Sequence, residues 1–213
     1  TEGGDAVGAL PYLKRAAGLA EHPSILINLA AAERAAGNAQ AALAAMRHAA
    51  ELAPTDAGVL FRLARLSFEC GDSGGARSSV TAIDIRAIND APFLADVAKM
   101  LLLVDQPTAA LAAAARARAI DASAPGILDA EGLAQLELGR TEDALKILRA
   151  AAEARPNLVE PVINLGMALA VAGRFEDALP VLDVAVERDG DHADARFNRG
   201  LVRLALGDDA GGW

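Results

Sequence analysis

The neighbouring carboxylates Glu142 and Asp143 are groups that could act as a general acid and base. The segment that holds them, GRTEDAL at 139–145, returns almost unchanged as GRFEDAL at 173–179, which is 34 residues later. The pair Glu142/Asp143 and its counterpart Glu176/Asp177 each lie at the start of a predicted helix, where negative charge interacts favourably with the helix dipole. We therefore expect a structural role for these acids, without acid–base catalysis.

The three histidines, His22, His48 and His192, are scattered and form no H-E-x-x-H pattern. Cys70 is the single cysteine, so no CxxC pair exists, and free cysteine behaves as a small buried hydrophobe more often than as a reactive thiol. No phosphate-binding G-x-x-x-x-G-K-[ST] loop occurs. The sequence thus predicts no metal, no cofactor and no enzyme within this segment.

Composition narrows the possible partners. The formal net charge of −9 and the pI near 4.8 argue against nucleic acid or an anionic membrane as a partner. No apolar run is long enough for a membrane span, which takes about 18 residues. A single cysteine favours a reducing compartment, and we expect a cytoplasmic, bacterial protein. Hydrophobic residues make up 53% of the chain but aromatics only 3%, and the many alanines favour helices.

The 34-residue offset recurs along the whole chain. Small residues return at two positions of the repeat, and a turn residue returns at a third. The three sets are Ala30, Ala64, Ala98, Gly132, Gly166 and Gly200; Ala42, Ala76, Ala110, Ala144 and Ala178; and Gly37, Gly71, Asp105, Gly139, Gly173 and Gly207. Each repeat reads as two amphipathic helices, a first and a second, that are separated by the glycine turn. The small residues would let the two helices approach closely.

This pattern resembles the tetratricopeptide repeat (TPR), a 34-residue helix–turn–helix unit with small residues where its helices cross. The resemblance implies an all-α, right-handed TPR solenoid that forms one domain over 1–213. The repeat at 91–124 has Asp105 and Pro107 at its turn, so we expect it to be the least regular. The predicted units are a partial one at 4–22, full ones at 23–56, 57–90, 91–124, 125–158 and 159–192, and a truncated one at 193–213.

Members of the TPR family bind a protein or peptide ligand in a groove lined by their first helices. The resemblance therefore implies a ligand-binding groove, in which basic residues would prefer acidic ligands and asparagines would grip the ligand backbone. The alternative for the asparagines is that they cap helices or face solvent, and for Leu133 and Met167 that they belong to the core. The candidates are Asn28, Arg62, Arg65, Lys99, Leu133, Ile163, Asn164, Met167, Phe197, Asn198 and Leu201.

Some TPR proteins clamp the C-terminal carboxylate of chaperones with lysine, arginine and asparagine side chains. Asn164 matches the middle position of that set. Asp129 and Leu133 do not supply its basic and amide partners, and Asp194 has the wrong charge. A chaperone-tail clamp is therefore disfavoured in this stretch.

The C-terminal end carries an arginine stripe at Arg196, Arg199 and Arg203, followed by LALGDDAGGW. The stripe is either a solvated end face or, together with Trp213, a contact with a downstream domain. The ending resembles the G-D-x-x-x-G-W of bacterial proteins that join TPRs to a C-terminal glycosyltransferase. That resemblance implies a segment cut from a longer protein, which recruits an acceptor such as flagellin. The alternative is a stand-alone scaffold or a secretion-chaperone adaptor, whereas a self-contained enzyme has no supporting residues.

Overall fold

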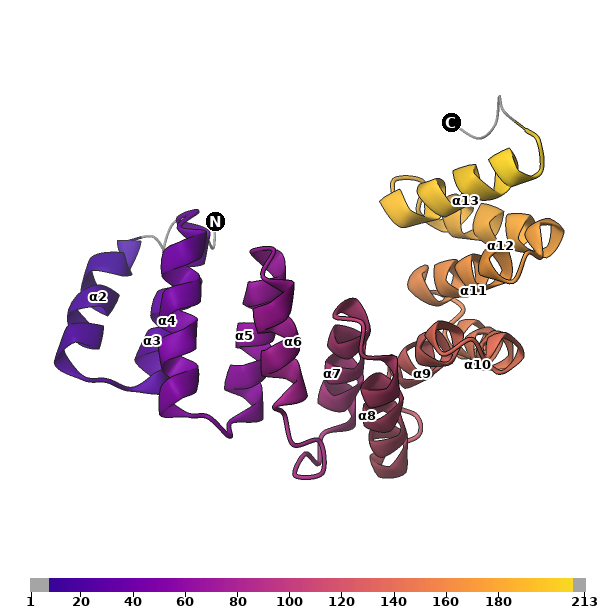
Figure 1. The fold of residues 1–213 in the computed structure, drawn as a ribbon. Helices are drawn as coiled ribbons and strands as arrows, with labels where there is room; N and C mark the ends of the chain where they lie inside the picture. The colour runs from indigo at the N-terminus through magenta and orange to yellow at the C-terminus, as the bar shows by residue number, and fades with distance from the viewer. Residues whose placement is uncertain (1–7, 209–213) are drawn as a thin grey trace. The chain divides into compact units, whose positions relative to one another are not determined.

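The computed structural model describes residues 8–208, and all regular secondary structure in that range is helical (Figure 1). The all-α fold class is thus confirmed. The helices are α2 (Leu10–Leu19), α3 (Pro23–Ala35), α4 (Ala39–Leu52), α5 (Ala57–Glu69), α6 (Ser73–Thr81), α7 (Ala91–Leu103), α8 (Pro107–Ile120), α9 (Ile127–Glu137), α10 (Thr141–Ala154), α11 (Glu160–Val171), α12 (Phe175–Arg188) and α13 (Ala193–Ala205). None of these helices is long and apolar enough to cross a bilayer.

The glycine turns have the geometry that the repeat predicts. At each turn position the backbone is left-handed, and glycine adopts this conformation without steric cost. In the first such turn the N–H of Gly37 donates to Arg34 O at 3.0 Å and the N–H of Asn38 donates to Glu33 O at 2.8 Å. These two hydrogen bonds end the helix and reverse the direction of the chain. The φ values are 80° at Gly37, 78° at Gly71, 59° at Asp105, 75° at Gly139, 74° at Gly173 and 82° at Gly207.

The small residues lie where the two helices of a repeat cross. The alanines at the second-helix position, from Ala42 to Ala178, are all completely buried. Gly166 of α11 faces Leu182 of α12 so closely that an added Cβ would lie 2.6 Å from the leucine Cγ. Gly132 meets Leu148 in the same way, also at 2.6 Å. The recurring small side chains are therefore required by the packing distance between helices.

The predicted irregularity at 91–124 is wrong. Helices α7 and α8 have 13 and 14 residues, because Asp105 takes over the left-handed turn that glycine makes elsewhere. Aspartate is one of the few residues that visit this conformation readily. The short helix is instead α6, with nine residues of sequence SGGARSSVT. Glycine and serine are poor helix formers, and this composition explains its length.

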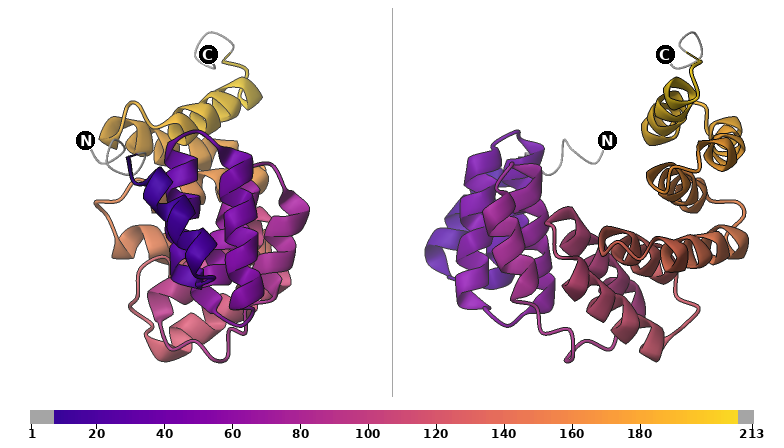
Figure 2. Two further views of the ribbon diagram at one scale, coloured as in Figure 1. Left: turned by 90° about the vertical axis from the view of Figure 1, so that its left-hand side faces the viewer. Right: turned by 45° about the vertical axis from the view of Figure 1, so that its right-hand side comes forward.

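The chain divides into two compact units, and the helices of each can be followed by their colour in Figures 1 and 2. Among the described residues, the N-terminal unit comprises those through Ile88 together with Leu103–Gln106, and the C-terminal unit comprises Asn89–Leu102 and those from Pro107 onward. In each unit the core lies between successive helices, for example around Leu43 and Leu63 in the first and around Leu148 and Leu182 in the second. The single continuous domain over 1–213 stays a prediction.

Candidate functional site

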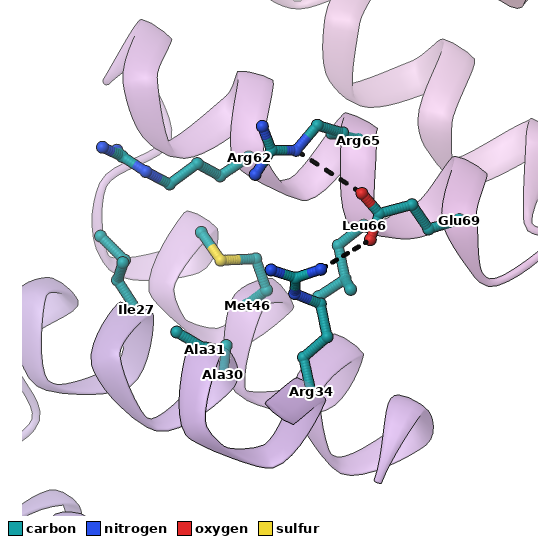
Figure 3. A pocket seen from close by; sticks show the side chains of 9 residues that line it. All are labelled: Ile27, Ala30, Ala31, Arg34, Met46, Arg62, Arg65, Leu66 and Glu69. Atoms are coloured by element: carbon teal, nitrogen blue, oxygen red, sulfur yellow. Dashed lines mark ion pairs between the residues drawn. The ribbon is translucent and has the colours of Figure 1, made fainter. Parts of the chain in front are cut away.

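A pocket opens between α3 and α5, the first helices of two successive repeats in the N-terminal unit (Figure 3). Its volume is about 150 Å³. The floor is apolar, because Ala30, Met46 and Leu66 are buried there and Ile27 is half-buried beside them. The charged side chains that line the pocket are long and stand at its rim. They are Arg34, Arg62, Arg65 and Glu69.

Glu69 is the one acid of this lining, and it lies between two arginines (Figure 3). Its carboxylate oxygens lie 3.7 Å from Arg34 Nη1 and 3.7 Å from Arg65 Nε. Arg62 has no ion-pair partner among the described residues, so its guanidinium can accept a ligand. The pocket thus holds three positive charges against one negative charge, in a chain whose net charge is −9.

The local sequence explains how these groups meet. Helix α5 begins at a cap, where Asp56 Oδ1 accepts a hydrogen bond from the backbone N–H of Val59 at 3.0 Å. From this start, Arg62, Arg65 and Glu69 follow at spacings of three and four residues, which places them on one helix face. Arg34 belongs to the last turn of α3, where a cation is stabilised by the helix dipole.

Two of the four basic and amide candidates from the N-terminal half therefore share one site. Arg62 and Arg65 line the pocket. Asn28 is exposed on α3 but is not part of the lining. Lys99 belongs to the C-terminal unit, where its Nζ lies 3.7 Å from Asp96 Oδ1 of the same helix.

Ile163, predicted as a groove residue, lies in the core of the C-terminal unit. Its side chain is buried, with 5% of its surface exposed. It packs in a small core with Val162, Ala185 and Ala195, where α11, α12 and α13 meet. An aliphatic side chain at this position gains more from the helix interface than from solvent, which explains its burial.

Asn164 is engaged inside the protein. Its Nδ2 donates to Asp129 Oδ1 at 3.2 Å, and the same aspartate pairs with Arg155. Asp129 is buried on α9 with 5% of its surface exposed, so the asparagine and the arginine satisfy a charge that would otherwise be costly. This is neither a helix cap nor a solvent contact. The three asparagines are therefore not equivalent, since Asn28 is exposed and Asn198 half-buried.

The remaining apolar candidates differ in exposure. Leu133 packs against the core of the C-terminal unit and is half-buried, and Met167 is half-buried as well. On α13 the side chains of Phe197 and Leu201 are 65% and 49% exposed. Those two are the only members of this group with a large accessible surface among the described residues.

Two arginines of the stripe form ion pairs with Asp183 of the same chain. Arg199 Nη1 and Arg203 Nη2 each lie 3.6 Å from Asp183 Oδ1 on α12. Arg196, the third member, is exposed. Trp213, which was expected to join the stripe in a downstream contact, lies outside the described residues.

A second pocket, of about 490 Å³, lies between α10 and α12, the second helices of two repeats in the C-terminal unit. Its floor comes from α11, through Val162, Leu165 and Leu169. Its charged lining is more balanced than that of the first pocket. It consists of Arg149, Arg174, Arg188, Glu153 and Asp177.

Sequence reasoning missed Ile27, Arg34 and Glu69 as pocket residues. A usable signal existed for Glu69, which follows Arg65 by four residues and so must share its helix face. Ile27 and Arg34 are seven residues apart and share a face of α3 for the same reason. What the pattern alone does not reveal is that these two faces point into one pocket.

The comparisons with known proteins agree with this architecture. Residues 135–204 match the family model described as tetratricopeptide repeat. No curated protein sequence matches the chain. Among solved structures, a TPR protein from Parabacteroides merdae ATCC 43184 has a TM-score of 0.83 at 16% identity, covering 98% of this chain and 83% of that one.

Two further structures show the same fold. YrrB, described as a TPR protein with an unusual peptide-binding site, has a TM-score of 0.60 at 21% identity over 86% of this chain and 95% of that one. PilW, described as a type IV pilus biogenesis factor, has a TM-score of 0.70 at 18% identity over 89% and 88%. The chain therefore has the fold of TPR proteins, and its residues 135–204 carry that family's sequence pattern.

Proposed function

We propose that this chain is a non-catalytic module that binds a segment of another protein on the faces of its first helices. The observation that carries the proposal is the α3–α5 pocket, which combines an apolar floor with an unpaired excess of arginine. Apolar contact supplies binding energy, and the charges supply selectivity. The fold, and the peptide-binding site for which YrrB is described, support the same function.

We further propose that the module recruits a flagellin-like acceptor for an attached C-terminal glycosyltransferase in a bacterial cytoplasm. The support is the resemblance at the C-terminal end, of which Gly207 and Asp208 lie among the described residues and Gly212 and Trp213 do not. The alternative is a scaffold or secretion-chaperone adaptor without an enzyme. The gene sequence beyond Trp213 separates the two, since a nucleotide-sugar-binding domain supports recruitment and further repeats or a stop codon contradict it.

The binding function is tested by photo-cross-linking on the whole chain. A benzophenone amino acid at Ala31, which is exposed and lines the pocket, should capture a partner from an extract of the source cells. The same group at Ala41, which is exposed on α4 outside the pocket, is the matched control. A partner captured at both positions alike would contradict a site on the first helices.

The captured partner is then purified and titrated. The double variant Arg62→Ala and Arg65→Ala should weaken binding about two- to thirtyfold, since each exposed ion pair contributes roughly 0.2–1 kcal/mol. The control, Arg77→Ala with Arg86→Ala, removes the same charge from exposed positions outside the pocket. Equal affinities of the two folded double variants would place the ligand elsewhere.

A further inference from the structure

We propose that the α3–α5 pocket receives an aliphatic side chain and a neighbouring carboxylate of the partner segment, and that Glu69 holds the place of that carboxylate until the partner binds. This inference rests on the proposed binding function and names the ligand chemistry of the same site. It makes Glu69 a built-in competitor, which lowers affinity for every acidic ligand.

The apolar floor of the pocket indicates that the ligand presents an aliphatic side chain. Met46 and Leu66 are buried at 3% and 7% exposure, and Ile27 is half-buried next to them. A cavity of this size, about 150 Å³, accommodates a group as large as benzene. Methionine is flexible and adapts to irregular shapes, so the floor suits several aliphatic side chains. The first requirement on the ligand is therefore one leucine-sized side chain.

The excess of arginine around the pocket indicates that the ligand also presents a carboxylate. Three guanidinium groups surround the floor, and Glu69 neutralises only part of their charge. Its two ion pairs are long, at 3.7 Å each, whereas a charge-assisted hydrogen bond has a length of about 2.7–2.9 Å. Glu69 is thus loosely held between Arg34 and Arg65, and both of its partners are more than half exposed. A ligand carboxylate can approach either guanidinium, or the unpaired Arg62, in the closer bidentate geometry.

The occupant that fits is a protein segment. The apolar and the charged requirement lie within one small site, so they must be met by groups that are held together, as neighbouring side chains of a peptide are. The excess of positive charge complements an acidic segment and disfavours a basic one. A free small anion would satisfy the arginines but leave the apolar floor exposed to water.

The test uses the full chain and a defined probe. The probe is a fluorescein-labelled twelve-residue peptide built from leucine and glutamate, and its partner peptide has glutamine in place of every glutamate. Fluorescence anisotropy gives the dissociation constants. The wild-type chain should prefer the glutamate peptide, and acetate at the same carboxylate concentration should not displace it.

Glu69→Gln should tighten binding of the glutamate peptide by about two- to fivefold, which is the range that exposed ion pairs contribute, and should leave the glutamine peptide unaffected. Glu51→Gln makes the same change in net charge at an exposed position of α4 outside the pocket, and should have no effect. Circular dichroism checks that both variants fold, and Glu69→Ala provides a second variant with the same expected gain.

The outcomes separate this inference from the binding function itself. If Glu69→Gln binds the glutamate peptide no tighter than Glu51→Gln does, Glu69 is not a competitor and the inference is wrong. If the wild-type chain shows no preference between the two peptides, the acidic ligand class is wrong. In both cases the cross-linking at Ala31 still decides whether the face binds a protein. Displacement by acetate, or self-association of the chain in place of probe binding, would overturn the assignment of a partner segment.

Discussion

Two corresponding places in the chain show how one repeat yields different surfaces. In the N-terminal unit, Ile27 of α3 and Arg62 of α5 line the same pocket, and Arg62 has no ion-pair partner among the described residues. In the C-terminal unit, Asp129 of α9 and Asn164 of α11 occupy the same two repeat positions, also 35 residues apart, and hydrogen-bond to each other. An aliphatic neighbour leaves the polar side chain available, whereas an acidic neighbour engages it.

The two pockets also differ in the balance of charged residues that line them. The α3–α5 pocket has three cations against one acid, whereas the α10–α12 pocket has three cations against two acids. In the second, Arg174 Nη2 lies only 2.6 Å from Asp177 Oδ2, so part of the charge is paired within the protein. Position in the repeat thus fixes where a side chain lies, and the acidic side chains near it, on the same helix or about one repeat away, determine whether it is free to bind.

The scaffold itself should be equally sensitive in both units. Ala42 of α4 and Ala144 of α10 are completely buried at equivalent positions. Replacing either with leucine should lower the free energy of unfolding by about 1–3 kcal/mol, because a tight helix crossing cannot accept three additional carbons without strain. Urea titration followed by circular dichroism measures the change. Alanine to leucine at exposed Ala112 is the control, and a neutral result at both buried sites would mean that the small residues do not mark packed crossings.

The comparison can be broken deliberately by making the first pair resemble the second. Ile27→Asp would place a carboxylate beside Arg62 and remove part of the apolar floor. We expect it to weaken binding of the glutamate peptide about tenfold, because an apolar contact is lost and a new carboxylate competes with the ligand for Arg62. Ile27→Asn introduces a polar group without the charge and should lose less. If the aspartate variant binds as well as wild type, Ile27 does not belong to the site.

The asparagines offer a smaller and more selective contrast. Asn164→Ala removes a donor to buried Asp129 and should cost about 0.5–1.5 kcal/mol of stability. Asn28→Ala changes an exposed side chain and should stay within about 0.5 kcal/mol of wild type. Thermal melting measured on both variants would settle the contrast. Equal losses would contradict the distinction between an internal and a free amide.

Acid should reveal a carboxylate pairing in the N-terminal unit. Hydrogen bonds from Lys14 and Asn38 lower the pKa of the Glu33 carboxyl below its ordinary value of 4.5. Because the folded-state pKa is lower than the unfolded one, this stabilisation is complete above about pH 4.5 and is lost as the pH falls through the folded value. Glu33→Gln should therefore flatten the decline of the melting temperature on the acid side. An unchanged acid limb would show that other carboxyls control it.

Much of the fold was predictable because it depends on recurring local chemistry. Glycine at the turns predicts left-handed caps, and these are present at Gly37, Gly71, Gly139, Gly173 and Gly207. Alanine at the crossings predicts a close approach of the two helices, and the alanines from Ala42 to Ala178 are completely buried there. The exception is also local. Asp105 in place of glycine predicts an irregular repeat, but aspartate tolerates the left-handed backbone, and the shortest described helix is α6, which is rich in poor helix formers.

The candidate site was predictable only in part. Arg62 and Arg65 follow from helical spacing on one face. The other charged residues of the lining, Arg34 and Glu69, and the apolar floor come together only through the packing of α3, α4 and α5. Ile163 is buried because it packs against Ala185 of α12 and Ala195 of α13, and no pattern within its own helix distinguishes that from exposure.

The sequence by itself determined the helical repeat, because turn residues and small crossing residues act over a few positions and recur with a fixed period. Only the tertiary structure decided which polar side chains remain available to a ligand. That property depends on a neighbour about one repeat away: Ile27 leaves Arg62 unpaired, whereas Asp129 engages Asn164. A charge or an amide is free or engaged according to the distance to its nearest partner, and that distance is set by the packing of helices.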